Sequence, residues 1–96
     1  MKNNSSVNIL VLNWNGEKVI INCLKSLNET FYKNKEIFVI DNASEDTSVE
    51  LINNNFPNVK IVSLDKNYKY AKGNNLGFQK INNAKYTIFL NNDTIV

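Results

Sequence analysis

Amide and carboxylate side chains recur in this sequence wherever an apolar run ends. Four runs are followed by such residues, which are Asn13 and Asn15, Asp41 and Asn42, Asp65 and Asn67, and Asn91, Asn92 and Asp93. Their oxygens can accept hydrogen bonds from a ligand or coordinate a hard cation such as Mg²⁺ or Mn²⁺. Asp93 is the candidate metal ligand, and its single carboxylate would need the diphosphate of a substrate to complete the coordination. Taken alone, an Asn-Asp cluster is also typical of a simple turn, so both interpretations stand at this point.

The runs that precede these side chains have the character of buried parallel strands. They are apolar on both faces and rich in β-branched residues, and they cover residues 8–13, 36–41, 59–64 and 86–90. Between them, the apolar spacing predicts helices over residues 17–28, from Asp46 as N-cap to an exit at Pro57, and over residues 70–81. The predicted order is therefore β-α-β-α-β-α-β.

Strands that alternate with helices predict an α/β fold, here a Rossmann-like arrangement of three layers around a mostly parallel sheet. In such sheets, ligands bind beyond the carboxyl ends of the strands. The four polar strand ends are therefore expected to lie on one rim. No linker or repeat interrupts the pattern, so residues 1–96 are expected to form a single domain.

The composition excludes several classes of function. The net charge is +2 and the lysines are scattered, which speaks against a nucleic-acid-binding stripe. No apolar run is long enough to span a membrane, and residues 1–6 lack the apolar core of a signal peptide. Cys23 is the only cysteine and the chain has no histidine, which excludes an internal disulfide, zinc ligation and Ser-His or Cys-His chemistry. These features favour a cytoplasmic protein.

Two common phosphate-binding motifs are missing. The first strand is followed by Asn13-Trp14-Asn15-Gly16 rather than by the glycine pattern of dinucleotide-binding proteins. Gly73-Asn74-Asn75 is not followed by the Lys-Ser or Lys-Thr of a P-loop. Binding of a phosphate would need another device, such as a divalent ion.

Four segments, in this order, resemble motifs of family 2 glycosyltransferases, particularly of the rhamnosyltransferase-like branch. They are residues 7–16 (VNILVLNWNG), 40–46 (IDNASED), 67–77 (NYKYAKGNNLG) and 89–94 (FLNNDT, the D-x-D region). The resemblance implies the GT-A fold and transfer, with inversion, from a UDP- or dTDP-sugar to an acceptor hydroxyl, with Mg²⁺ or Mn²⁺ at the diphosphate. It makes the chain the nucleotide-sugar-binding half of such an enzyme, and it implies a glycan or lipid-linked saccharide as acceptor. The setting would be cell-surface polysaccharide biosynthesis, with the protein peripheral at the inner face of the membrane.

The resemblance also assigns site residues. Asp41 matches the acid that accepts a hydrogen bond from the base, and its place at a strand end favours this role over the alternative of capping the following turn. Trp14 matches the loop beside the base, where it would either stack on the base or cover the sheet. The remaining residues of the expected nucleotide-binding set are Asn13, Asn15, Asn67, Gly73, Asn74, Asn75 and Asn92, with Asp93 as metal ligand.

Two positions depart from the family pattern. Asn91 replaces the first acid of the D-x-D motif, which removes a charge near the ion. Lys69 replaces a glycine, and a lysine with positive φ would cost roughly 1 kcal/mol. Lys69 is then a solvated side chain, a phosphate contact, or the sign of a different loop.

Two rival functions remain to be weighed. A flavodoxin-like signalling domain would need acids at the end of the first strand, where this chain has Asn13, Trp14 and Asn15. A nucleotide-sugar-binding fragment or inactive relative fits better, because the family's general base lies beyond the D-x-D region. No carboxylate here matches that base, so we expect the 96-residue chain to be incomplete relative to the family, to contain no catalytic residue and to transfer no sugar alone. We also expect such a small sheet to leave an edge uncovered and to self-associate.

Overall fold

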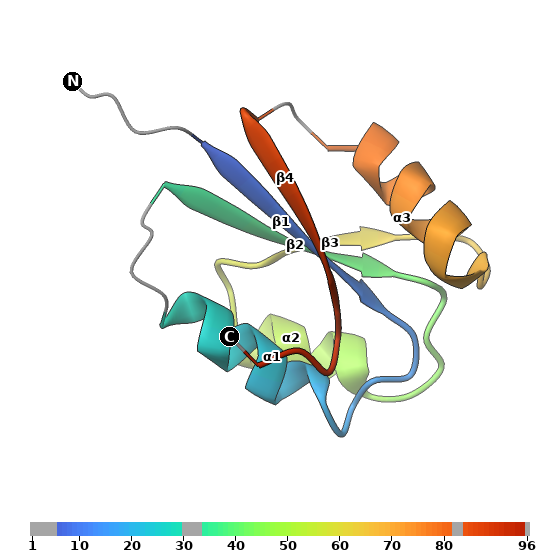
Figure 1. Ribbon diagram of the computed structural model, residues 1–96. Helices are drawn as coiled ribbons and strands as arrows, with labels where there is room; N and C mark the ends of the chain where they lie inside the picture. Colours follow the sequence, from blue (N-terminus) through green and yellow to red (C-terminus); the bar gives the residue numbers. More distant parts are fainter. Residues whose placement is uncertain (1–5, 30–33, 82–83, 96) are drawn as a thin grey trace.

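The computed structural model describes residues 6–29, 34–81 and 84–95 and has seven alternating elements (Figure 1). They are β1 (Val7–Asn13), α1 (Ile20–Asn28), β2 (Lys35–Asp41), α2 (Ser48–Asn55), β3 (Lys60–Ser63), α3 (Lys69–Gln79) and β4 (Tyr86–Asn91). The predicted order is confirmed. The largest difference is at α1, which begins three residues later than expected because residues 17–19 form a turn.

The four strands form one parallel sheet in the order β3-β2-β1-β4. In this register Asn13 lies beside Asp41, and Leu12 lies beside Asn91. The carboxyl ends of the two central strands and of β4 therefore meet at one rim, as the sequence predicts. The α/β class and the Rossmann-like arrangement are confirmed.

Both faces of the central strands are buried, because helices cover each of them. Figure 1 shows α1 and α2 together on one side of the sheet and α3 on the other. Side chains of β1 alternate between the two layers, with Ile9 and Val11 toward α1 and α2, and Leu10 in the cluster that α3 covers. This two-sided burial explains why the strands are apolar runs rather than alternating patterns.

Helix α3 lies close against the sheet at Gly77. A Cβ atom at this position would come within 2.5 Å of Ile40, so a larger residue would push the helix away from β2. Within the described part of the chain, no helix has the length and apolar character needed to cross a membrane.

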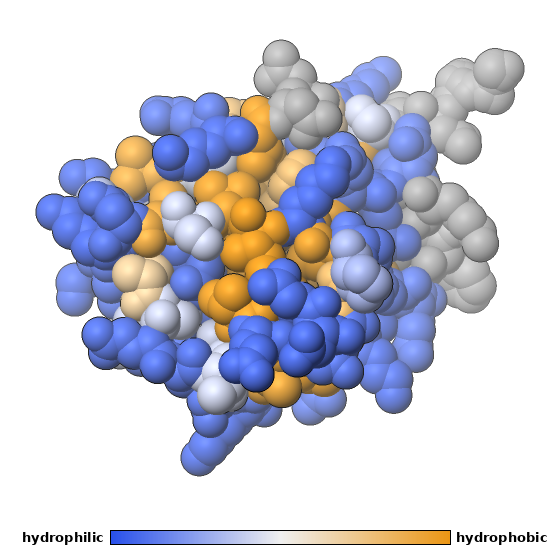
Figure 2. Space-filling model, turned by 180° about the vertical axis from the view of Figure 1, so that it is seen from behind, coloured by the Kyte–Doolittle hydropathy of each residue, from blue (hydrophilic) through white to orange (hydrophobic). Residues whose placement is uncertain are grey.

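The edge strand β4 is poorly covered. Tyr86 and Ile88 on one face of the sheet and Phe89 on the other are all exposed. On the side turned away from the viewer of Figure 1, hydrophobic residues also form a band bordered by hydrophilic ones (Figure 2). The uncovered edge expected from the sequence is therefore present at β4.

Candidate functional site

The side chain of Asn13 joins three segments at the rim. It is the last residue of β1 and is 0% exposed. Its Nδ2 donates to Asp41 Oδ1 at 3.0 Å, to Ser48 Oγ at 2.9 Å and to Ser44 Oγ at 3.3 Å. Its Oδ1 accepts a hydrogen bond of 3.0 Å from Asn92 Nδ2. One buried amide thus connects the ends of β1 and β2 to the turn that follows β4.

The carboxylate of Asp41 is only 4% exposed and holds the turn after β2. Oδ1 accepts from Asn13 and from the Ser44 hydroxyl at 2.7 Å, while Oδ2 accepts the Ser44 backbone N–H at 3.0 Å. Asp41 therefore caps the turn that follows β2. Because a carboxylate has about four acceptor sites, these three hydrogen bonds leave Asp41 able to accept another, so the base-binding role stays a prediction.

The loop that carries Trp14 is fastened to the loop after β2. Asn15, with φ of 50°, accepts the Glu45 N–H through Oδ1 at 2.8 Å, and its own N–H donates to Ser44 Oγ at 2.9 Å. Trp14 itself is 52% exposed, so about half of its surface is open to solvent at the rim. The side-chain oxygen of Asn15, expected to contact a nucleotide, is used to join the two loops.

Glu17 and Asp46 strengthen the same junction. Glu17 accepts the Thr47 N–H at 3.0 Å, and Asp46 Oδ2 accepts the Glu17 N–H at 3.0 Å. Asp46 Oδ1 also accepts from the Ser48 N–H at 3.0 Å and from its hydroxyl at 2.6 Å. The cap position of α2 is Thr47 rather than Asp46, because the helix begins at Ser48, one residue later than the sequence suggests. Desolvation acts to raise the pKa of Asp46, but these hydrogen bonds from Ser48 and Glu17 lower it overall.

Two asparagines shape the start of α3. Asn42, which is buried, accepts the Tyr68 N–H at 3.0 Å and donates to the Lys69 carbonyl at 3.3 Å. Asn67 accepts the Lys69 N–H at 2.9 Å, and Lys69 has φ of 69°. The position occupied by glycine in the family pattern thus has positive φ here, so Lys69 bears the strain that the sequence comparison anticipates.

Gly73 approaches protein closely. A Cβ atom on it would lie 2.8 Å from Asn42 Nδ2 and 3.0 Å from Leu12 Cδ1. The absence of a side chain therefore lets α3 sit on Asn42 and the sheet. Contact between Gly73 and a nucleotide stays a prediction.

Asn74 carries an unsatisfied polar atom. The residue is 5% exposed, and its buried Oδ1 has no hydrogen-bond partner among the described residues. Such a group is costly and calls for a ligand, an ion or water. A hollow of about 270 Å³ between α3 and β4 is lined by Asn74, exposed Asn75, Tyr70, Ala71 and Phe89.

Asp93 is exposed in the turn after β4. This turn is closed by a hydrogen bond of 3.1 Å from the Thr94 N–H to the Asn91 carbonyl. Burial raises the pKa of the Cys23 thiol, and the negative charge of Asp93 raises it further. A hydrogen bond involving Thr94 acts to lower this pKa. The turn that carries Asp93 lies beside α1, where the Cys23 Sγ donates to the Asn91 carbonyl at 3.8 Å. The described residues hold no group of three or more His, Cys, Asp or Glu side chains that could hold a metal. The role of Asp93 as a metal ligand, with a ligand's own phosphates completing the coordination, therefore stays a prediction.

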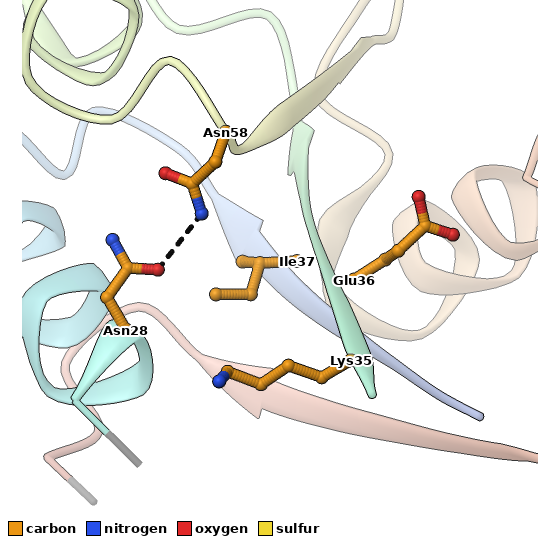
Figure 3. A pocket seen from close by; sticks show the side chains of 5 residues that line it. All are labelled: Asn28, Lys35, Glu36, Ile37 and Asn58. Atoms are coloured by element: carbon orange, nitrogen blue, oxygen red, sulfur yellow. Dashed lines mark hydrogen bonds between the residues drawn. The ribbon is translucent and has the colours of Figure 1, made fainter. Parts of the chain in front are cut away.

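A second hollow lies at the opposite end of the strands (Figure 3). It has a volume of about 290 Å³ and is lined by Lys35, Glu36 and Ile37 at the start of β2, and by Asn28 and Asn58, which share a hydrogen bond of 3.1 Å. None of the predicted site residues lines it. The rim at the carboxyl ends is therefore the candidate site.

Three residues of this rim escaped the sequence analysis as site residues: Asn42, Ser44 and Ser48. Ser44 and Ser48 supply hydroxyls to Asn13, and Asn42 fastens α3. The sequence signals were the polar end of the second predicted strand, the family-like segment 40–46 and the turn chemistry of residues 42–48. None of them says which partners the side chains choose.

The fold and its polar rim define an α/β domain of nucleotide-binding type. The profile of the family described as Glycosyl transferase family 2 matches residues 8–96. The chain therefore belongs to glycosyl transferase family 2. A sequence search of curated proteins gives no match.

Solved structures agree with this fold. TarS 1–349 from S. aureus superimposes with a TM-score of 0.83 at 22% identity, over 94% of this chain and 28% of that one. TarS 1–349 in complex with UDP-GlcNAc gives 0.80 at 24%, over 92% and 26%. The mannosyltransferase PcManGT from Pyrobaculum calidifontis, in complex with GDP-Man and Mn²⁺, gives 0.85 at 19%, over 97% and 29%. At these identities the likeness shows the GT-A fold, and the chain spans less than a third of the length of these structures.

Proposed function

We propose that this chain is the donor-binding part of an inverting glycosyltransferase and binds a UDP- or dTDP-sugar at the rim. The observation that carries the proposal is the hydrogen-bonded link from Asp41 through Asn13 to Asn92. It supports the proposal because it connects the buried carboxylate of Asp41 to the turn that bears Asp93 on a family 2 fold. A nucleoside diphosphate has its base at one end and its phosphates at the other. Asp41 suits the base, and the turn that bears Asp93 suits the phosphates.

At the base end, Asp41 accepts the N3–H of uracil or thymine. A carboxylate is acceptor-only, which matches a ring N–H donor. Trp14 stacks on the base, because the fastened loop holds its exposed ring at the rim. Asn15 supports this platform through the neighbouring loop.

At the diphosphate end, Asp93 is the protein's carboxylate ligand to Mg²⁺ or Mn²⁺. Since the Asn92 amide nitrogen donates to Asn13, its carbonyl oxygen faces elsewhere and can face the ligand. When bound, the ion offsets the charge that develops on the departing diphosphate. Asn67, Gly73, Asn74 and Asn75 complete this side, and the unsatisfied Oδ1 of Asn74 accepts from a ligand hydroxyl or a bound water.

The neighbours support a nucleotide-sugar as ligand, since structures of TarS contain UDP or UDP-GlcNAc and PcManGT contains GDP-Man and Mn²⁺. For the whole protein we propose the rhamnosyltransferase-like branch of the family and a glycan or lipid-linked saccharide as acceptor. Its place would be the cytoplasmic face of the membrane, in cell-surface polysaccharide biosynthesis.

The experiment is titration calorimetry of the 96-residue chain with UDP, dTDP, GDP, NAD and ATP in the presence of Mn²⁺. We expect UDP or dTDP to bind most tightly, because Asp41 matches N3–H and the chain lacks both glycine-rich phosphate motifs. Equal or tighter binding of ATP or NAD would overturn the proposal.

The alternative is a nucleotide-sugar-binding fragment or inactive relative. We propose that the 96-residue chain alone binds donor but transfers no sugar, because Asp41 serves the base and Asp93 the leaving-group side. Inverting transfer needs a base within hydrogen-bond reach of the acceptor hydroxyl on the other face. A donor-turnover assay with added acceptor tests this, and turnover by the short chain would contradict it.

A further inference from the structure

Asn13 is the most extensively hydrogen-bonded side chain of the rim, and none of its surface reaches solvent. It is 0% exposed, and its amide makes three donor contacts and one acceptor contact within the protein. A side chain in this position has no free face for a nucleotide. Its effect on a ligand must therefore pass through the residues that it holds.

The orientation of the Asn13 amide is determined by its partners. Asp41 is a carboxylate and can only accept, so the Asn13 nitrogen must face it and the carbonyl must face Asn92. Rotating the amide by half a turn would place oxygen against oxygen at Asp41 and nitrogen against nitrogen at Asn92. The side chain can therefore serve both neighbours in one orientation only.

Gly16 makes room for this arrangement. A Cβ atom at residue 16 would lie 2.2 Å from Asn13 Oδ1 and 2.3 Å from Asn92 Nδ2. Any side chain here would separate the two amides. The backbone of the loop after β1 thus packs directly over the link between β1 and the turn of Asn92.

We propose that Asn13 is a positioning residue of the donor site, a buried amide that orients Asp41 toward the base and anchors Asn92 so that the Asp93 turn keeps its place. This inference rests on the proposed function. The Asn13 N–H pins Oδ1 of Asp41, which leaves the other oxygen, held by one Ser44 N–H, to meet the ligand. The Asn13 carbonyl accepts the hydrogen bond from the Asn92 amide and so anchors the turn of Asp93 at the diphosphate end.

The test separates the two ends of the ligand. Base recognition is measured as the ratio of dissociation constants for N3-methyl-UMP and UMP, since methylation removes the donor that Asp41 accepts. In the unaltered chain we expect a ratio of about 10 to 100, the value of one hydrogen bond to a charged group. The diphosphate end is measured as the gain in UDP affinity on adding Mn²⁺.

Asn13→Ala removes both links, so the methyl ratio should fall close to unity and the Mn²⁺-dependent gain should be lost. Asn13→Asp keeps an oxygen for Asn92 but cannot donate to Asp41 as the amide does. It should therefore lose the methyl ratio and keep the Mn²⁺ gain. Ile52→Val, a fully buried change in the core between α2 and the sheet, is the control for lost stability and should alter neither quantity.

An intact methyl ratio in both Asn13 variants, with UMP and its methyl derivative weakened in parallel, would overturn the inference. If the unaltered chain itself does not discriminate the methyl derivative, the proposed role of Asp41 fails instead, so the two failures are distinguishable.

A measurement on the unaltered chain covers the case in which the variants do not fold. The Asn13 side-chain amide protons should be protected from exchange and shift when UMP binds, without a nuclear Overhauser contact to the uracil. A direct contact to the uracil would show that Asn13 is a ligand residue and would overturn the inference.

Discussion

Lys69 takes a backbone conformation that suits glycine better than lysine. Its φ of 69° is held by Asn67 and Asn42, which bind its N–H and carbonyl. A residue with a Cβ in this region costs roughly 1–2 kcal/mol. Strain of this kind persists only where neighbouring contacts impose it, and it often marks functional loops.

Lys69→Gly is therefore expected to stabilise the chain by up to about 1 kcal/mol, because relief of the strain exceeds the added entropy of the unfolded chain. Urea denaturation measures this. Lys72→Gly, in the same helix, is the matched control and should destabilise by about 1 kcal/mol. The affinity for UDP distinguishes the two interpretations of the Lys69 side chain. If Lys69 contacts a phosphate, Lys69→Gly weakens UDP binding, and if the side chain is only solvated, the affinity is unchanged.

Asp93→Asn is expected to weaken UDP binding in Mn²⁺ and to change it little in EDTA. The reason is that the described residues offer no cluster of three ionisable ligands, so an ion would depend on this carboxylate and on the diphosphate. Calorimetry in both buffers provides the comparison. An equal loss of affinity with and without metal would mean that Asp93 contacts the ligand directly or supports the turn.

At the scale of elements, hydrogen bonds between the loops after β1 and β2 replace a helix cap of the usual kind. Glu17 from the first loop binds Thr47 at the cap position of α2, and Asp46 binds Glu17 and Ser48. The start of α2 is therefore tied to the loop that carries Trp14. This arrangement fixes the position of the loop on which the proposed stacking of Trp14 depends.

The stability of this junction should depend on pH. The pKa of Asp46 is lowered in the folded state, so its contribution is present above the unfolded value of about 4 and is lost as pH falls through the lower folded value. Denaturant unfolding from pH 6 to pH 2.5 should show a smaller loss of stability in Asp46→Asn than in the unaltered chain. Parallel pH profiles would contradict the role given to Asp46.

For the whole molecule, β3 and β4 are the two edge strands of the sheet, and β4 has the larger share of exposed side chains. Ile88 is 44% exposed, and β4 is an edge strand with one side free of partners among the described strands. Such edges pair with other chains unless charge or cover prevents it. We expect the isolated 96-residue chain to self-associate or to be marginally stable.

Ile88→Lys should reduce this association, because a lysine on an edge strand disfavours pairing. Sedimentation at increasing concentration measures it, with Ile95→Lys as control, since Ile95 is exposed but lies beyond the strand. A monomer at high concentration with a cooperative melt above ~65 °C would contradict the expectation.

Much of the fold follows from local sequence. The apolar runs, the helical spacing of Ile20, Leu24 and Leu27, and the polar residues at strand ends predict all seven elements and their common rim. These signals are local, because side-chain periodicity is a property of neighbouring residues. The family motifs predict membership of the glycosyltransferase family in the same way, from short stretches of residues.

The partners within the rim depend on the tertiary structure alone. Asn13 meets Asp41 across 28 positions of the chain and Asn92 across 79. The sequence marks these three as polar residues at strand ends, but it does not show that Asn13 would be buried between the other two. It also does not show that Gly73 would rest on Asn42. Such choices are made by packing and by the need of each buried polar group for a partner, and both exist only once the strands lie side by side.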